Sequence, residues 1–295
     1  MNPRVLLHYA VAVGVCLGVL GTTVSAQTML APHKILILQR EVVKPGKGHA
    51  HGLVEAQWAQ AFKDAKASGW MGMTSLSGET RALFVQGFDS EAAWAANTAS
   101  VAKNAALSAK SAALADKDGD FLTGAQQAVL KYLPELSYHA DSIPVAGLRY
   151  WRIGAIHLKP GYGDDFIERR KIVKAAHEKA KLDEAFLMYH VLEGSNGFDT
   201  YVIFIPMKSL AEDDDNDALH GEAYRKALPE DWKATGIKFA REAVSSGDTQ
   251  LFAVDPSMTV APKEWIEADK FWDPKPMMAK PMAKAKTDAK DAPKQ

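Results

Sequence analysis

The sequence has a single cysteine in 295 residues, and this residue, Cys16, lies within an apolar N-terminal stretch. Beyond that stretch the chain has no thiol, which excludes disulfides, cysteine nucleophiles and thiolate metal sites. Stability therefore has to come from packing, and a chain of this length can bury a core large enough to supply it.

An excess of one charge is also lacking, because 35 Lys and Arg residues balance 36 Asp and Glu residues, for a formal net charge of −1. A nucleic-acid partner would call for a basic surface, so none is expected. The chain contains no G-x-S-x-G, Walker loop, dinucleotide fingerprint or HExxH motif. Hydrolase, kinase and dehydrogenase chemistry of the usual kinds is not favoured, and no catalytic residue is assigned.

The first 26 residues have the three-part pattern of a secretory signal peptide. Arg4 comes first, an apolar run follows from residue 5 to 21, and small residues at 24–26 provide a cleavage site after Ala26. We expect export to the periplasm or the medium, with no transmembrane segment left after cleavage. A retained membrane anchor is the alternative, which the short run and its His8 disfavour.

The last 22 residues, 274–295, are rich in lysine, alanine and proline and contain no aromatic residue. Such a composition cannot bury enough apolar surface to offset the entropy lost on ordering, so a disordered tail is predicted. A tether to an anionic surface is the alternative to a solvated terminus.

One pattern occurs twice, and the chain is organised around it. Residues 42–48 read Val-Val-Lys-Pro-Gly-Lys-Gly, and residues 157–163, 115 positions later, read His-Leu-Lys-Pro-Gly-Tyr-Gly. Proline cannot continue a strand ladder and glycine permits a turn, so each copy ends an apolar strand and precedes an amphipathic helix. The spacing predicts a tandem duplication of a unit of about 110 residues.

Both units, at residues 34–143 and 147–257, are expected to follow the order strand, helix, strand, strand, helix, strand. The elements of the first unit are expected at residues 35–43, 48–68, 70–76, 82–88, 90–114 with 121–133, and 136–138. Those of the second are expected at residues 148–158, 163–181, 185–192, 201–205, 209–228 with 232–245, and 250–254. This order is the split βαβ, or ferredoxin-like, topology of the α+β class.

With Lys-Pro-Gly-x-Gly between the first strand and helix of each unit, residues 34–257 resemble the dimeric α+β-barrel superfamily, nearest to its NIPSNAP-like and antibiotic-monooxygenase-like members. The resemblance implies two four-stranded sheets that pack face to face around a lumen, both from one chain. A monomer, or a homo-oligomer of it, follows from this arrangement. The superfamily includes cofactor-free monooxygenases, isomerases and haem enzymes of the chlorite dismutase type, so it does not select a function.

Three polar residues of the second unit are the candidate ligand-binding groups. Alternation along the strand at 148–158 places Tyr150 and Arg152 on one face, which we assign to the lumen. A buried arginine needs a carboxylate or a ligand anion, and Glu41 is the expected partner across the lumen. His190 is expected to face the same space as a base or ligand. A structural ion pair or an exposed strand end is the alternative for Arg152, and a core or surface position is the alternative for His190.

Haem would need an axial histidine, and the candidates are His177 and His220. The alternative for His177 is a core histidine bonded to a backbone carbonyl, because it lies on the apolar stripe of its helix. No other cofactor is expected.

No metal site is expected. His49 and His51 diverge on a helix and are interpreted as part of a solvated helix start; metal chelation from a loop is the alternative. The acidic run at 116–120 fails as a calcium loop, because Phe121 stands where glycine is needed and Gln127 where a bidentate glutamate is needed. We interpret this run as an acidic turn before a helix.

The favoured function is therefore the binding of a small, largely apolar molecule in the lumen, with Tyr150, Arg152 and His190 fixing its orientation. An enzyme, either a cofactor-independent oxygenase or a haem protein, is one alternative. An interaction module of the cell envelope without a small ligand is the other.

Overall fold

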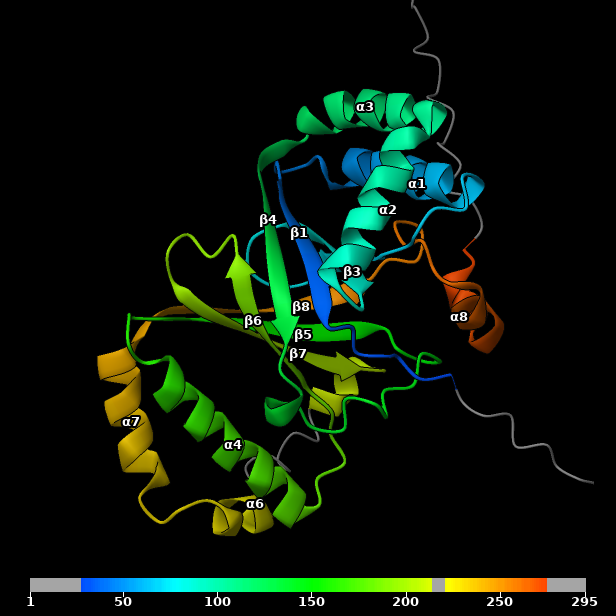
Figure 1. Ribbon diagram of the computed structural model, residues 1–295. Helices are drawn as coiled ribbons and strands as arrows, with labels where there is room; N and C mark the ends of the chain where they lie inside the picture. Colours follow the sequence, from blue (N-terminus) through cyan, green and yellow to red (C-terminus); the bar gives the residue numbers. More distant parts are fainter. Residues whose placement is uncertain (1–27, 214–220, 275–295) are drawn as a thin grey trace, which may run out of the picture.

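The structure is a computed structural model that describes residues 28–213 and 221–274, so the expected signal peptide and nearly all of the expected tail lie outside the described residues. The described residues form a closed barrel of eight strands with helices on its outside (Figure 1). This mixed architecture confirms the expected α+β class.

Every strand pair of the barrel is antiparallel, and the order around it is β1-β3-β2-β8-β5-β7-β6-β4. The strands are β1 (Ile35–Val43), β2 (Met71–Ser75), β3 (Arg81–Phe88), β4 (Leu122–Tyr132), β5 (Tyr150–Leu158), β6 (Leu187–Glu193), β7 (Asp199–Met207) and β8 (Val244–Val254).

The first four strands in sequence and the last four form neighbouring arcs of the barrel wall. Two strand pairs join the arcs. Met73 of β2 pairs with Val254 of β8, and Leu130 of β4 pairs with Val191 of β6. The expected face-to-face sheets are therefore joined at both edges, which leaves no open sheet edge in the barrel.

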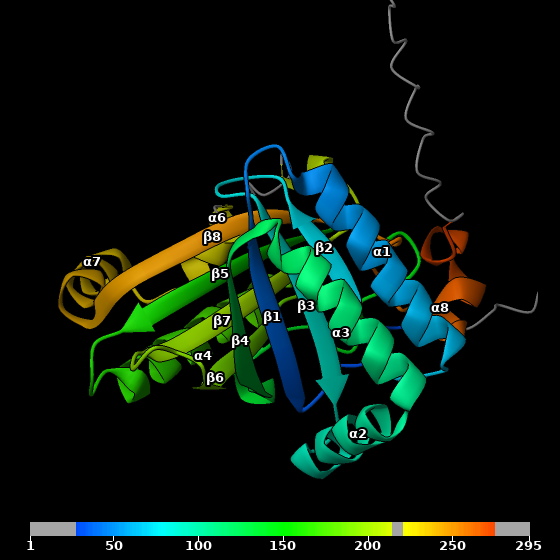
Figure 2. The same ribbon diagram turned by 90° about the horizontal axis from the view of Figure 1, so that it is seen from above.

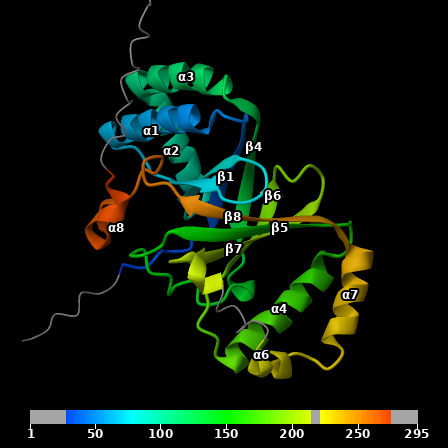
Figure 3. The same cartoon turned by 180° about the vertical axis from the view of Figure 1, so that it is seen from behind.

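The helices divide between the two arcs, as Figures 2 and 3 show from above and from behind. The helices beside the first arc are α1 (Gly48–Asp64), α2 (Glu91–Lys103) and α3 (Ala105–Gly119). Those beside the second are α4 (Gly163–Ala180), α6 (Glu222–Ala227) and α7 (Trp232–Ala243), while α8 (Lys263–Ala268) follows the last strand. Among the described residues, none of these helices combines the length and apolar character needed to cross a membrane.

The prediction of a helix at 121–133 and a closing strand at 136–138 is wrong. Residues 122–132 form β4, which pairs with β1 on one side and β6 on the other. Ladder hydrogen bonds on both sides override the local helical preference. Leu136 ends a short 3-10 helix, η1 (Pro134–Leu136), and Tyr138 makes a single bridge to Phe186.

Two other expected helices are interrupted. The stretch 90–114 divides into α2 and α3 at Asn104, whose side-chain oxygen accepts the Leu107 N–H at 3.1 Å and so caps α3. The stretch 209–228 contains only the 3-10 helix η2 (Leu210–Asp213) and α6 within the described residues. The last strand, β8, begins at residue 244 rather than at 250.

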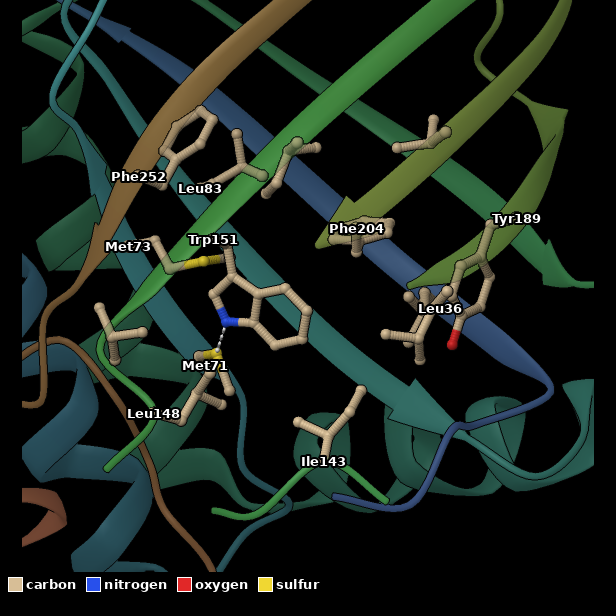
Figure 4. Close-up of a cluster of buried hydrophobic side chains, with 14 of the residues drawn as sticks. Leu36, Met71, Met73, Leu83, Ile143, Leu148, Trp151, Tyr189, Phe204 and Phe252 are labelled. Atoms are coloured by element: carbon tan, nitrogen blue, oxygen red, sulfur yellow. Dashed lines mark hydrogen bonds between the residues drawn. The ribbon is translucent and has the colours of Figure 1, made fainter. Parts of the chain in front are cut away.

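The interior of the barrel is filled by large apolar side chains over much of its length (Figure 4). Trp151 and Phe204 meet edge to face with ring centroids 6.1 Å apart, and Tyr189 meets Phe204 at 5.6 Å. Burial of such rings is the main favourable contribution to the stability of the barrel, at about 25 cal/mol per Å2 of apolar surface.

Candidate functional site

A cavity of about 300 Å3 lies at one end of the barrel, next to the packed interior. It is lined by side chains from β1, β2, β3, β5, β6 and β7 and from segments near both ends of the described chain. The lining residues are Leu30, Ala31, Pro32, His33, Leu36, Ser68, Gly69, Trp70, Met71, Met73, Val85, Gly87, Trp151, Leu187, Tyr189, Phe204, Val260, Pro262 and Trp265. Most of them are apolar, so the cavity favours an apolar occupant.

Three polar hydrogens lie among these apolar side chains. Trp151 Nε1 donates to Met71 Sδ at 3.2 Å, and a thioether is a weak acceptor. The Tyr189 hydroxyl donates to the His33 carbonyl at 3.2 Å, and burial raises the pKa of Tyr189, so this group stays a neutral donor. Trp70 Nε1 donates to the Met258 carbonyl at 2.8 Å. The Trp151 N–H is thus the donor with the weakest partner.

The segment that follows β8 packs across this end of the barrel. Val260 N–H donates to the Trp70 carbonyl at 3.0 Å. A Cβ at Gly69 would lie 1.9 Å from the Val260 carbonyl oxygen, and one at Gly72 would lie 2.7 Å from that of Met258. Only glycine permits so close an approach of two backbones, so these two positions let the segment form part of the cavity wall.

The assignment of Tyr150 and Arg152 to the lumen is wrong. Their neighbours Trp151 and Ile153 belong to the interior cluster, and the alternation of β5 turns Tyr150 and Arg152 to the other face. A small barrel fills its interior with apolar side chains, so the less polar face of the strand is the inner one. Neither residue lines the cavity. A ligand-binding role for them stays a prediction.

The expected pairing of Glu41 with Arg152 across the lumen is also wrong. Leu36 and Leu38 of β1 pack in the interior, so Glu41 faces outward, beneath the helices. Its Oε2 atom lies 2.9 Å from His51 Nε2 on α1, and its Oε1 atom accepts a hydrogen bond from Gln39 at 2.7 Å.

Glu41 is one of four side chains, with His51, Glu55 and Asp118, that meet in a buried polar cluster between β1, α1 and α3. His51 and Glu55 are four residues apart and share one face of α1. Asp118, in the last turn of α3, places Oδ1 3.7 Å from His51 Nε2. One ligand atom from each of the four lies within 4.8 Å of the others, and each residue is at most 4% exposed.

The cluster holds three carboxyl groups and one imidazole with little access to water. Burial, together with the charges of Glu41 and Asp118, raises the pKa of Glu55 to about 9. Burial also raises the pKa of Asp118 to about 6; His51 lowers it and Glu41 raises it. Glu55 Oε1 and Asp118 Oδ1 are buried and have no hydrogen-bond partner among the described residues. A buried polar atom without a hydrogen-bond partner destabilises the folded state unless a bound group interacts with it.

This cluster is not predicted from the sequence. His51 was expected at a solvated helix start, and Glu55 was not a candidate. Residues 116–120 were expected to form a turn before a helix, whereas residues 116–119 are the end of α3 and precede a strand. The available signal was the i, i+4 spacing of His51 and Glu55 together with a glutamate inside an apolar strand. The contribution of Asp118 needs the tertiary fold.

His190 does not face the lumen. Leu187 and Tyr189 of β6 line the cavity, so His190 lies on the opposite face of the strand. Its Nε2 atom is 2.7 Å from Asp199 Oδ1 of β7, and its ring lies tilted against that of Tyr201, with centroids 4.8 Å apart. His190 is half-buried and its Nε2 atom has a partner, which agrees with the alternative that it is a core or surface residue.

His177 is a core histidine. Its Nδ1 atom is 2.8 Å from the Val173 carbonyl oxygen, and the rings of Phe186 and Tyr224 lie 5.1 and 5.0 Å away. The imidazole is 1% exposed and does not line the cavity, so it does not fit the role of an axial haem ligand. His220 lies outside the described residues, and its haem role stays a prediction.

No protein-family model and no curated protein matches this chain. Among solved structures, a candidate monooxygenase of Fusobacterium nucleatum is 14% identical, with 75% of this chain and 91% of that chain covered and a TM-score of 0.49. An anthrone oxidase-like protein is 14% identical, with 77% of this chain and 94% of that chain covered and a TM-score of 0.46. A chlorite dismutase variant from Candidatus Nitrospira defluvii is 12% identical, with 82% of this chain and 98% of that chain covered and a TM-score of 0.45.

At such identities and TM-scores the likeness does not assign an activity, a substrate or a cofactor to this chain. The assignment of the fold rests on the closed order of the eight strands.

Proposed function

We propose that this protein binds a small, largely apolar molecule in the cavity at the end of the barrel. The observation that supports this proposal is the cavity itself, about 300 Å3 in volume and bounded by the rings of Trp70, Trp151, Tyr189 and Phe204. Ligand pockets range from about 300 to 1,000 Å3, and an apolar cavity of about 150 Å3 already accepts benzene. A molecule of one or two rings fits these limits.

The orientation of the ligand would be set by the Trp151 N–H. Its present acceptor is a thioether, so a carbonyl or ether oxygen placed beside Met71 would be a stronger acceptor. The titratable side chains that line the cavity are His33 and Tyr189, and the hydroxyl of Tyr189 already donates to a backbone carbonyl. This set favours binding over a reaction, so no reaction is proposed.

A cavity-filling substitution tests the proposal. Val85 lines the cavity from β3, and Val85→Phe adds most of a ring to that space. Leu76→Phe, at a side chain that is 51% exposed, is the matched control. Titration calorimetry with indole and naphthalene should give binding by the wild-type protein and the control, and at least about tenfold weaker binding by Val85→Phe.

Circular dichroism must show that both variants are folded. The proposal is overturned if the wild-type protein binds neither probe, or if Val85→Phe binds both as tightly as the control. Native mass spectrometry of the protein as purified adds the identity of any retained natural ligand.

We also infer that the protein is exported and that its two halves arose by tandem duplication. The composition of residues 1–26 supports the first inference. The second is supported by element bounds that repeat at an offset of 115 residues, since β1 and β5 begin at 35 and 150, and α1 and α4 begin at 48 and 163. The same mass spectrum should give the intact mass of a chain that starts at Gln27. A mass that includes residues 1–26 would contradict cleavage of a signal peptide.

A further inference from the structure

The buried polar cluster of Glu41, His51, Glu55 and Asp118 lies on the opposite side of the barrel wall from the cavity. It gathers ligands from three separate elements, β1, α1 and α3, and α1 and α3 lie side by side outside the barrel (Figure 2). A hydrogen bond from Trp58 Nε1 to Ser111 Oγ, at 3.2 Å, ties the same two helices together further along. The cluster is therefore held on a packed scaffold.

Acidic groups outnumber basic groups in the cluster. Three carboxyl groups face one imidazole, which is 2.9 Å from Glu41 and 3.7 Å from Asp118. Within the part of the chain that the structure describes, Glu55 Oε1 and Asp118 Oδ1 are buried without a hydrogen-bond partner, and both residues are more than nine-tenths buried. Buried carboxylates are normally paired with a cation or ligated to a metal.

The corresponding place in the second half of the chain has apolar side chains at two of the four positions, and Arg170, whose Nε atom is buried, stands where the first half has Glu55. At an offset of 115 residues Glu41 corresponds to Ile156 and His51 to Phe166. Both pack in the apolar cluster between β5, α4 and α7, where the Phe166 ring lies 4.4 Å from Tyr201 and 6.5 Å from Phe239. Apolar packing usually stabilises such a place at least as well as buried charge, which argues that the polar cluster is kept for something it binds.

We propose that Glu41, His51, Glu55 and Asp118 together bind one divalent transition-metal ion, of the Mn²⁺, Fe²⁺ or Zn²⁺ class. Imidazole nitrogen combined with carboxylate oxygen suits these ions, whereas Mg²⁺ and Ca²⁺ prefer oxygen ligands alone. Ligand atoms about 2.0 to 2.2 Å from one ion lie at most about 4.4 Å from each other. The observed spread of 4.8 Å needs only a small closure.

The surroundings complete the site in the way metal centres require. Gln39 Nε2 donates to Glu41 Oε1 at 2.7 Å, which orients the carboxylate and leaves Oε2 toward the cluster. All four side chains are closed off from solvent, which is typical of a structural metal site. The ion would thus clamp α1 and α3 onto β1.

Metal analysis and thermal unfolding of the whole chain test the proposal. After treatment with EDTA and dialysis, the wild-type protein should take up one Mn²⁺ or Zn²⁺ per chain by elemental analysis. At free metal 100 times above Kd, the unfolding equilibrium constant should fall about 100-fold. Co²⁺ should give visible absorption bands of a bound ion, a readout independent of stability.

Two variants make the result specific. Glu55→Gln keeps the shape but removes a ligand charge, and should weaken Mn²⁺ and Zn²⁺ binding at least about tenfold. Asp64→Asn, an exposed carboxylate at the end of the same helix, should bind as the wild type does. Lack of uptake by the wild-type protein, or equal uptake by Glu55→Gln, overturns the proposal. Selective binding of Ca²⁺ or Mg²⁺ instead overturns the transition-metal assignment.

Discussion

At the scale of single residues, the main physical problem of this protein is the placement of three carboxyl groups where water does not reach. An ionised carboxylate in such a place is destabilising, and the usual response is to hold its proton more tightly. Glu55 does so, with a pKa raised to about 9 by burial and by the charges of Glu41 and Asp118. The metal-free protein should therefore respond to pH in a defined direction.

We predict that the metal-free protein loses stability as the pH rises from about 5 to about 9. In the unfolded chain Glu55 loses its proton near 4.5, and in the folded chain near 9. The folded state binds more protons in between, so the contribution of this group is fully present below about 4.5 and is lost as the pH rises through about 9. Asp118, with a pKa of about 6, acts in the same direction at lower pH. Thermal melts in EDTA should show Tm falling by an amount that corresponds to several kcal/mol.

The groups that face Glu55 are Glu41 from β1, His51 from α1 and Asp118 from α3. Glu55→Gln removes the titrating group, so its Tm in EDTA should fall less steeply between pH 5 and 9 and should exceed that of the wild type near pH 9. Asp64→Asn should keep the wild-type slope. A wild-type Tm that does not change over this interval would contradict the raised pKa of Glu55.

Residue-level inference from the sequence succeeded where one local bond decides the outcome and failed where a strand face had to be chosen. For His177 the core alternative is confirmed by its bond to the Val173 carbonyl. For β5 the alternation separates Trp151 from Arg152 but does not say which face is inside, and polarity is a poor guide because a small barrel has a dry interior. The polar cluster is formed by residues from three elements, and the periodicity within one element does not predict which elements pack together.

At the scale of elements, the strands and helices on either side of Lys-Pro-Gly-x-Gly begin 115 residues apart in the two halves, as the repeat predicts. This succeeds because proline and glycine end a strand through local backbone geometry. The strand β4 could not be predicted from such local signals. Its residues include Ala125, Gln126, Gln127 and Ala128, which have no strand preference, and it becomes a strand because β1 and β6 supply partners on both sides.

We predict that the break between α2 and α3 depends on one side chain. Asn104 accepts the Leu107 N–H at 3.1 Å, so Asn104→Ala should lower the free energy of unfolding by about 1 kcal/mol. Asn104→Asp keeps an acceptor and should stay within a few tenths of a kcal/mol of the wild type. Urea denaturation of both variants provides the measurement. Equal losses for alanine and aspartate would show that the cap contributes nothing.

At the scale of the whole molecule, the barrel is closed by two halves, and neither half closes it alone. The first arc ends in β4 and β2, and both of these edges are paired with the second arc, through β6 and β8. Arg81 of β3 adds an ion pair to Asp248 of β8 at 2.6 Å. The segment after β8 returns to the first arc, where Trp70 donates to the Met258 carbonyl. Separation of the halves would therefore expose two strand edges and an apolar face together.

The fragment 27–143 should behave differently in solution from residues 27–273. Without the second arc, the inner face of the first, with Leu36, Met73, Leu83 and Leu130, meets water, at a cost of about 25 cal/mol per Å2 of apolar surface. The short fragment should recover that free energy by pairing with a second copy or by aggregating, whereas residues 27–273 should be soluble and monomeric. Light scattering after size-exclusion chromatography separates these outcomes. A folded, monomeric 27–143 fragment would mean that the first arc is stable without its partner, and that closure of the barrel is not what holds the halves together.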